Sequence, residues 1–81
     1  MENMMKDSVT VNEAKQRVTV LARVNAKKAT TFNGLFRLVM KELANGSKFD
    51  KGLYSAVKEA GSTKKIKLWI DEAIQNINIK F

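Results

Sequence analysis

The centre of the sequence, from residue 32 to residue 60, is restricted to α-helix by the type and spacing of its side chains. Val, Ile and Thr are the residue types that tolerate strands. The chain contains 17 of them, and only two, Val39 and Val57, lie between residues 32 and 60. The first part of this centre carries apolar side chains every three or four positions: Phe32, Leu35, Phe36, Val39, Met40 and Leu43. This spacing predicts a helix over residues 32–44.

A second helix is predicted directly after the first, because the residues between them carry stop and start signals. Asn45-Gly46 is typical of a helix end. Ser47 can cap a new helix that has Asp50 at its third position, near the positive end of the helix dipole. The apolar residues that follow share one side: Phe49, Leu53, Tyr54, Ala56, Val57 and Ala60. Gly61 then ends this helix.

The two flanks of this centre permit either helices or strands. Residues 63–78 place Ile66, Trp69, Ile70, Ala73, Ile74 and Ile77 at helical spacing. Residues 65–70 and 76–81 nevertheless also alternate as strands do. Residues 10–13, Thr-Val-Asn-Glu, match a capping box at a helix start, whereas residues 17–24 alternate and are rich in β-branched side chains.

We therefore expect a mainly α, single compact domain of about four helices, with room for short strands near residues 9–11 and 65–69. The alternative is an α+β domain in which two central helices are flanked by β-hairpins. Residues 8–81 are expected to form the one small globular domain, and residues 1–7 a flexible N-terminal tail. The first eight residues lack the apolar run of a signal peptide, and no stretch reaches the ~20 apolar residues that span a bilayer. We accordingly expect a cytoplasmic protein that does not act at a membrane.

The residue types that are missing exclude most catalytic and metal chemistry. The 81 residues include no His and no Cys, which removes imidazole and thiolate metal sites and Ser–His or Cys–His nucleophiles. Asp71-Glu72 is the one adjacent acidic pair, and neighbours on a helix point about 100° apart, so they cannot flank one substrate bond together. We expect a protein that is not an enzyme and that takes no metal, cofactor or small-molecule substrate.

Positive charge is the feature that points to a partner. The chain carries 15 Lys and Arg against 8 Asp and Glu, a net charge of +7, and residues 14–41 hold seven basic side chains and no acidic one. If residues 11–28 are helical, Lys15, Thr19, Arg23 and Lys27 form a ladder four residues apart. The candidate contact residues are Lys15, Arg23, Lys27 and Lys28, aided by Lys64, Lys65 and Lys67.

These residues predict a small basic binding protein that contacts the phosphates of DNA or RNA. The alternative is a protein-binding module, such as an inhibitor or adaptor of the kind that phages and other mobile elements encode, which docks on an acidic or nucleic-acid-binding protein surface. Lysines that only keep the chain soluble are the competing explanation of the charge. The aromatic side chains do not decide the matter, because Phe32, Phe36, Phe49, Tyr54 and Trp69 fall on apolar helix faces and are expected to pack in the core rather than to stack on bases.

Overall fold

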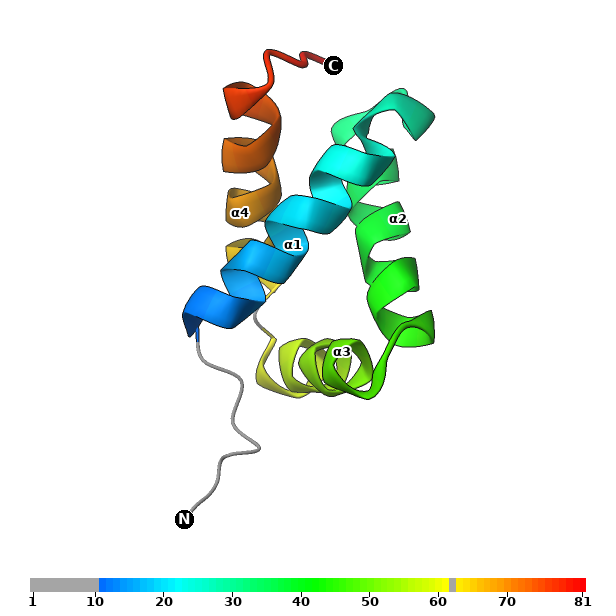
Figure 1. Cartoon of the computed structure of the whole chain (residues 1–81), viewed down its shortest axis with the longest axis vertical. Helices are drawn as coiled ribbons and strands as arrows, with labels where there is room; N and C mark the ends of the chain where they lie inside the picture. Colours follow the sequence, from blue (N-terminus) through cyan, green and yellow to red (C-terminus); the bar gives the residue numbers. More distant parts are fainter. Residues whose placement is uncertain (1–10, 62) are drawn as a thin grey trace.

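The structure, a computed structural model, describes residues 11–61 and 63–81. In these residues the chain forms four α-helices and one short 3-10 turn, in the order α1 (Val11–Asn25), η1 (Ala26–Lys28), α2 (Phe32–Asn45), α3 (Lys48–Ala60) and α4 (Thr63–Asn76) (Figure 1). The expected mainly α single domain is confirmed. None of the described helices has the length and apolar character that crossing a bilayer requires.

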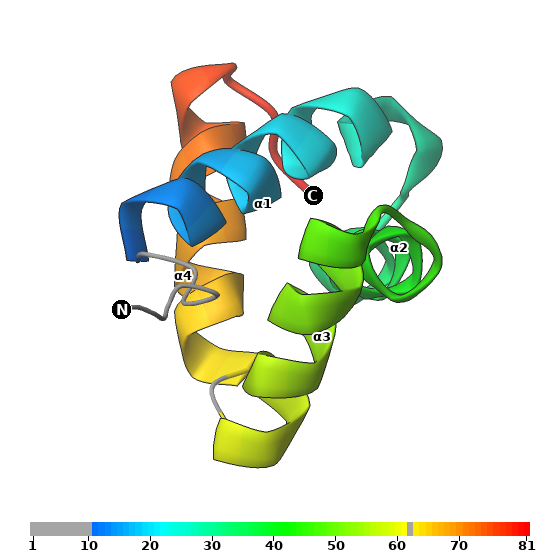
Figure 2. The ribbon, with the colours of Figure 1, turned by 60° about the horizontal axis from the view of Figure 1, so that its bottom comes forward.

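The helices pack around one core to which all four contribute. α1 lies across α4 and α2, and α3 turns sharply away from the end of α2 and leads to the start of α4 (Figures 1 and 2). The buried apolar side chains are Ala14, Val18, Leu21, Ala22, Ala26, Leu35, Val39, Leu43, Leu53, Val57, Ile66, Trp69, Ile70, Ala73 and Ile74. Each helix thus turns one side inward and leaves the opposite side exposed.

Both ends of α3 follow the predicted signals, whereas the cap at the start of α2 was not predicted. The hydroxyl of Thr31 accepts the backbone N–H of Gly34 at 3.0 Å and caps α2. At the start of α3, the hydroxyl of Ser47 accepts the N–H of Asp50 at 3.2 Å, and the Asp50 carboxylate accepts the N–H of Ser47 at 3.4 Å. Gly61 ends α3 in the left-handed conformation, with φ of 65°, which glycine adopts without a steric penalty.

In the residues that the structure describes, the strands that the sequence permitted do not form, so that prediction is wrong there. Residues 65–69 belong to α4, and no β-hairpin flanks the central helices in residues 11–61 and 63–81. A strand would place Trp69 on the opposite side from Ile66 and Ile70, whereas the helix buries all three together. Val11 is the first residue of α1.

Part of the sequence prediction falls on residues that the structure does not describe. The expected tail over residues 1–7, Val9 of the optional first strand and Thr10 of the expected capping box all lie outside the described residues.

The inner side of α3 differs from the one expected. Leu53 and Val57 are buried, but Phe49, Ala56 and Ala60 are exposed. The side of α3 that faces the core holds the buried Asp50 together with Leu53 and Val57. Phe49 is the residue before Asp50, and neighbouring side chains on a helix point about 100° apart, so the two cannot share that side. The expectation that Phe49 packs in the core is therefore wrong.

The other aromatic side chains lie where the sequence places them. Trp69 is buried, while Phe32, Phe36 and Tyr54 are partly buried and pack against the core. Packing against the core is the arrangement of structural rather than base-stacking aromatics, and a lysine amine lies over one of these rings, with Nζ of Lys58 5.8 Å from the centroid of the Tyr54 ring.

Candidate nucleic-acid interface

Four of the predicted contact residues follow α1 and the turn after it. Lys15 and Arg23 lie on α1, whereas Lys27 and Lys28 lie in η1, and all four are exposed. The helix that their four-residue spacing required is present. Lys15, Thr19 and Arg23 line one shallow hollow of about 470 Å³ on the outward side of α1.

Lys15 differs from the other three because its charge is paired within the fold. Its Nζ lies 3.2 Å from Oε1 of Glu72 on α4, and both side chains are about half exposed. An exposed pair of this kind contributes about 0–1 kcal/mol. The pair nevertheless draws the Lys15 amine toward α4, so Lys15 is a weaker candidate for an external phosphate than Arg23.

The remaining predicted residues, Lys64, Lys65 and Lys67, lie in the first turns of α4 and are exposed. The first turn of α4 holds no acidic residue, so these cations stand near the positive end of the helix dipole, where each costs about 0.3–1 kcal/mol at low ionic strength. The Nζ of Lys67 lies 5.0 Å from the centroid of the Phe36 ring on α2, within the range of a cation–π contact.

The structure does not join the two groups of cations into one surface. η1 follows the end of α1, whereas α4 begins beside the end of α3, and Figures 1 and 2 draw these two places at different ends of the molecule. The predicted residues therefore form two surfaces. We call them the α1–η1 surface (Lys15, Arg23, Lys27 and Lys28) and the α4 surface (Lys64, Lys65 and Lys67).

Arg17, which belongs to the same acid-free stretch, is withdrawn from both surfaces. Its Nε lies 2.8 Å from Oδ1 of Asp50, and only 1% of Asp50 is exposed. The hydrogen bond to this carboxylate raises the pKa of the Arg17 guanidinium above its usual value. The Ser47–Asp50 spacing signalled the cap at this carboxylate, but nothing in the sequence pointed to Arg17 as its partner.

The adjacent carboxylates Asp71 and Glu72 do not converge on one point. Asp71 accepts a hydrogen bond from Nε2 of Gln75, one turn later on α4, at 2.8 Å, while Glu72 pairs with Lys15 on α1. In residues 11–61 and 63–81, no group of three or more potential ligand side chains is arranged to hold a metal ion.

Exposed apolar side chains are the surface feature that sequence reasoning missed. Val20 and Val24 lie on the outward side of α1, and Leu68 lies on α4 one turn after Lys64, with exposed fractions of 47%, 59% and 55%. The sequence around each of these residues alternates as in a strand, and in a strand all three side chains would lie on the apolar, buried face. The helical period turns them outward instead.

Comparison of the chain with protein-family models, with curated proteins and with solved structures finds no match. The function therefore has to be argued from the charges and contacts of the chain itself.

Proposed function

We propose that this chain is a small, non-enzymatic protein that binds nucleic acid through contacts between its basic side chains and the phosphates. One observation carries the proposal. In the part of the chain that the structure describes, six of the seven predicted contact residues are exposed and pair with no carboxylate: Arg23, Lys27, Lys28, Lys64, Lys65 and Lys67.

The distribution of ion pairs supports phosphate contact more than a purely solubilising role. Lys15 and Arg17 each have a carboxylate partner on another helix, so the fold uses two of the seven charges in residues 14–41. The cations at the end of α1 and in η1 have no such structural task. Phosphates of a nucleic acid can replace the small counterions around these side chains, and the release of those counterions drives binding.

The absence of catalysis, which is part of the proposal, is supported by how the carboxylates are used. Asp71 accepts a hydrogen bond from Gln75 of its own helix, whereas Glu72 and Asp50 pair with Lys15 and Arg17 of α1, so each of the three carboxylates has a partner that is not a second carboxylate. Turnover of a nucleotide or ester substrate that Asp71→Asn or Glu72→Gln abolishes would overturn this part of the proposal.

A titration at two salt concentrations tests the proposal and reports which surface is used. We expect the chain to bind duplex DNA, single-stranded DNA or RNA at low salt and to lose affinity steeply as salt rises. For duplex DNA the slope of log K against log salt is about −3 if Arg23, Lys27 and Lys28 alone engage phosphates, and about −4 to −5 if Lys64 and Lys65 also do. Failure to bind any of the three nucleic acids at low salt discards the proposal.

A second candidate function rests on Leu68. This apolar side chain is 55% exposed and lies one turn from Lys64 and Lys65. An apolar residue beside unpaired cations suits an acidic protein surface, in which a hydrophobic anchor accompanies charge pairs. For such a module, Leu68→Ala weakens partner binding, whereas phosphate contact alone leaves nucleic-acid affinity unchanged by that substitution.

A further inference from the structure

The outward side of α1 carries polar side chains that the fold itself does not use. α1 lies across α2 and α4 with this side turned to solvent (Figure 1). In the part of the chain that the structure describes, the side chains of Asn12, Gln16 and Thr19 make no hydrogen bond. They belong to the shallow hollow of about 470 Å³ that is lined by Asn12, Lys15, Gln16, Thr19, Val20 and Arg23.

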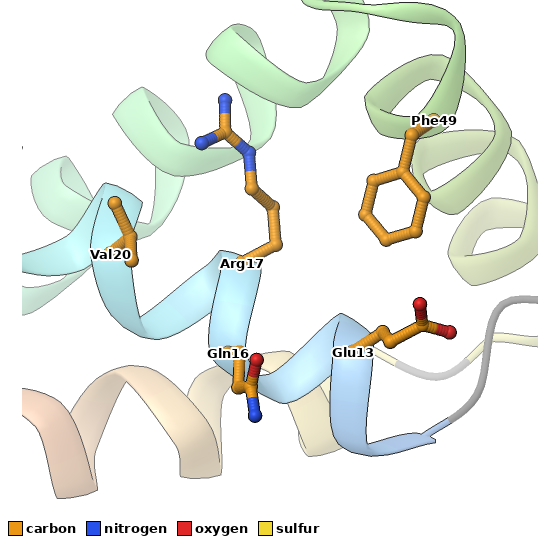
Figure 3. A pocket seen from close by; sticks show the side chains of 5 residues that line it. All are labelled: Glu13, Gln16, Arg17, Val20 and Phe49. Atoms are coloured by element: carbon orange, nitrogen blue, oxygen red, sulfur yellow. The ribbon is translucent and has the colours of Figure 1, made fainter.

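The charge of this hollow suits an anionic partner. No acidic side chain lines it. The neighbouring carboxylate, Glu13, lines a different hollow on the side of Phe49, and Figure 3 shows it directed to that side, whereas Gln16 points away from the Phe49 ring. Arg23 closes one end of the hollow, and the two exposed lysines of η1 follow beyond the end of the helix.

We propose that this side of α1 enters the major groove of duplex DNA and reads base edges there. The inference rests on the proposed function and deepens it by naming the ligand. The major groove admits an α-helix, and adenine presents in it one acceptor and one donor, which the side-chain amide of Asn or Gln matches. Asn12 and Gln16 are exposed and lie one turn apart on this side. The methyl groups of Thr19 and Val20 suit the methyl group of thymine, so the preferred sequence is expected to contain adjacent A·T base pairs.

The length of this side agrees with such a contact. Asn12 and Val20 are eight residues apart, or roughly 12 Å along the helix, which corresponds to about three to four base pairs. Arg23, Lys27 and Lys28 continue past this segment, where they can contact the phosphates that border the groove. Phosphate contacts position a protein on DNA, whereas base contacts specify the sequence. The middle of α1 is therefore assigned to sequence choice and its end, with η1, to affinity.

Duplex DNA suits this side better than the other nucleic acids do. The major groove of A-form RNA is deep and narrow, and side chains cannot read it. Single strands are bound largely by stacking of bases on aromatic rings, and no aromatic side chain lines the hollow. Val20, in contrast, is 47% exposed, which leaves an aliphatic side chain available to a thymine methyl.

Selection from a pool of random-sequence DNA duplexes tests the inference. We expect the full chain to enrich a short motif with adjacent A·T pairs. Gln16→Ala should weaken binding of the enriched duplex by about 5- to 100-fold and leave both the affinity for a scrambled duplex and the salt slope unchanged, because the amide carries no charge. Gln75→Ala, the same change at an exposed position of α4, is the matched control and should bind the enriched duplex as the natural chain does. Circular dichroism confirms that both variants are folded.

A modified base shows which groove is read. 7-Deazaadenine lacks the N7 acceptor in the major groove, but it still pairs with thymine and leaves the minor groove unchanged. Placed at the adenines of the enriched motif, it should weaken binding of the natural chain. It should have little additional effect on Gln16→Ala, because the hydrogen bond that it removes is already lost in that variant.

The outcomes separate this inference from the proposed function. Equal affinity for all duplexes at low salt, or binding restricted to RNA or single strands, overturns the inference and leaves the proposed function standing. An enriched motif that is bound equally well after Gln16→Ala, or with 7-deazaadenine, also overturns it, because another surface or the other groove then reads the bases. Failure to bind any nucleic acid overturns both, and the outward side of α1 is then left to a protein partner or to solvent.

Discussion

Arg17 on α1 holds the carboxylate of Asp50, the third residue of α3, through two parallel hydrogen bonds. Nε donates to Oδ1 at 2.8 Å and Nη2 donates to Oδ2 at 2.9 Å. The same carboxylate accepts the N–H of Ser47. One buried side chain therefore caps α3 and also fastens the α2–α3 turn to α1, so it connects two helices that are not consecutive in the chain.

The Arg17 side chain is 39% exposed, whereas that of Asp50 is only 2% exposed. Loss of the cation is therefore expected to lower the free energy of unfolding. Arg17→Ala leaves the Asp50 carboxylate buried without its counter-charge, and we expect the free energy of unfolding to fall by about 3 kcal/mol. Urea denaturation measures it. Lys15→Ala is the matched control, because it removes a cation from an exposed pair, and it should cost less than about 1 kcal/mol. Equal losses for the two variants would contradict a structural role for the Arg17–Asp50 pair.

Two glycines should respond to alanine in opposite directions. A Cβ on Gly46 would collide with the Asp50 side chain, so Gly46→Ala should destabilise the fold by about 1–3 kcal/mol. A Cβ on Gly52, in the middle of α3, meets nothing within 4 Å, so Gly52→Ala should stabilise it by about 1 kcal/mol through helix propensity. Thermal melting compares the two variants directly, and a stabilising Gly46→Ala would show that Asp50 does not occupy this position.

Trp69 should behave as a core residue. It is buried between Ile66, Ile70 and Ala73 on the inner side of α4, and Trp69→Ala should cost about 3–5 kcal/mol, enough to unfold a marginal domain. Leu68→Ala, one residue away but exposed, should change stability by less than about 0.5 kcal/mol. A Trp69→Ala variant that kept full stability and lost only binding would reassign Trp69 to the binding surface.

The cations should contribute unequally to nucleic-acid binding. Lys28→Ala and Arg23→Ala should each weaken duplex binding for all sequences alike and lower the salt slope by about one unit. Lys15→Ala should have a smaller effect on both quantities, since its amine is 3.2 Å from Glu72. Affinities measured at three or more salt concentrations give the slopes, and an equal loss for Lys15 and Lys28 would show that the Lys15–Glu72 pair opens in the complex.

Local sequence signals were sufficient where a helix boundary depends on neighbouring residues alone. Ser47 and Asp50 cap α3, and Gly61 ends it, because the groups that satisfy the free N–H and C=O groups of a helix end lie within four residues of it. The core positions of α2 followed from the same local periodicity, since Leu35, Val39 and Leu43 recur every four residues and all three are buried.

The flanks show where local signals fail. Residues 17–24 fit both a strand and a helix, and the choice depends on which side chains find a buried surface in the folded chain. Val18 and Leu21 of α1 and Ile66 and Ile70 of α4 are buried in one core with the central helices. If the flanks were strands, another packing partner would have to bury these side chains. Which segments pack together depends on residues that are far apart in the chain, so local patterns alone permitted a strand over residues 65–69.

By itself, the sequence determined that this is a mainly helical, strongly basic chain without the residues for most metal and nucleophilic chemistry, because composition and short-range periodicity carry that information. Only the tertiary structure decided which cations remain available. Arg17 and Asp50 are 33 residues apart, and Lys15 meets Glu72 on a helix at the other end of the chain. A helical pattern fixes the side of a helix on which a charge lies, but the packing of the helices fixes which opposite charge it meets.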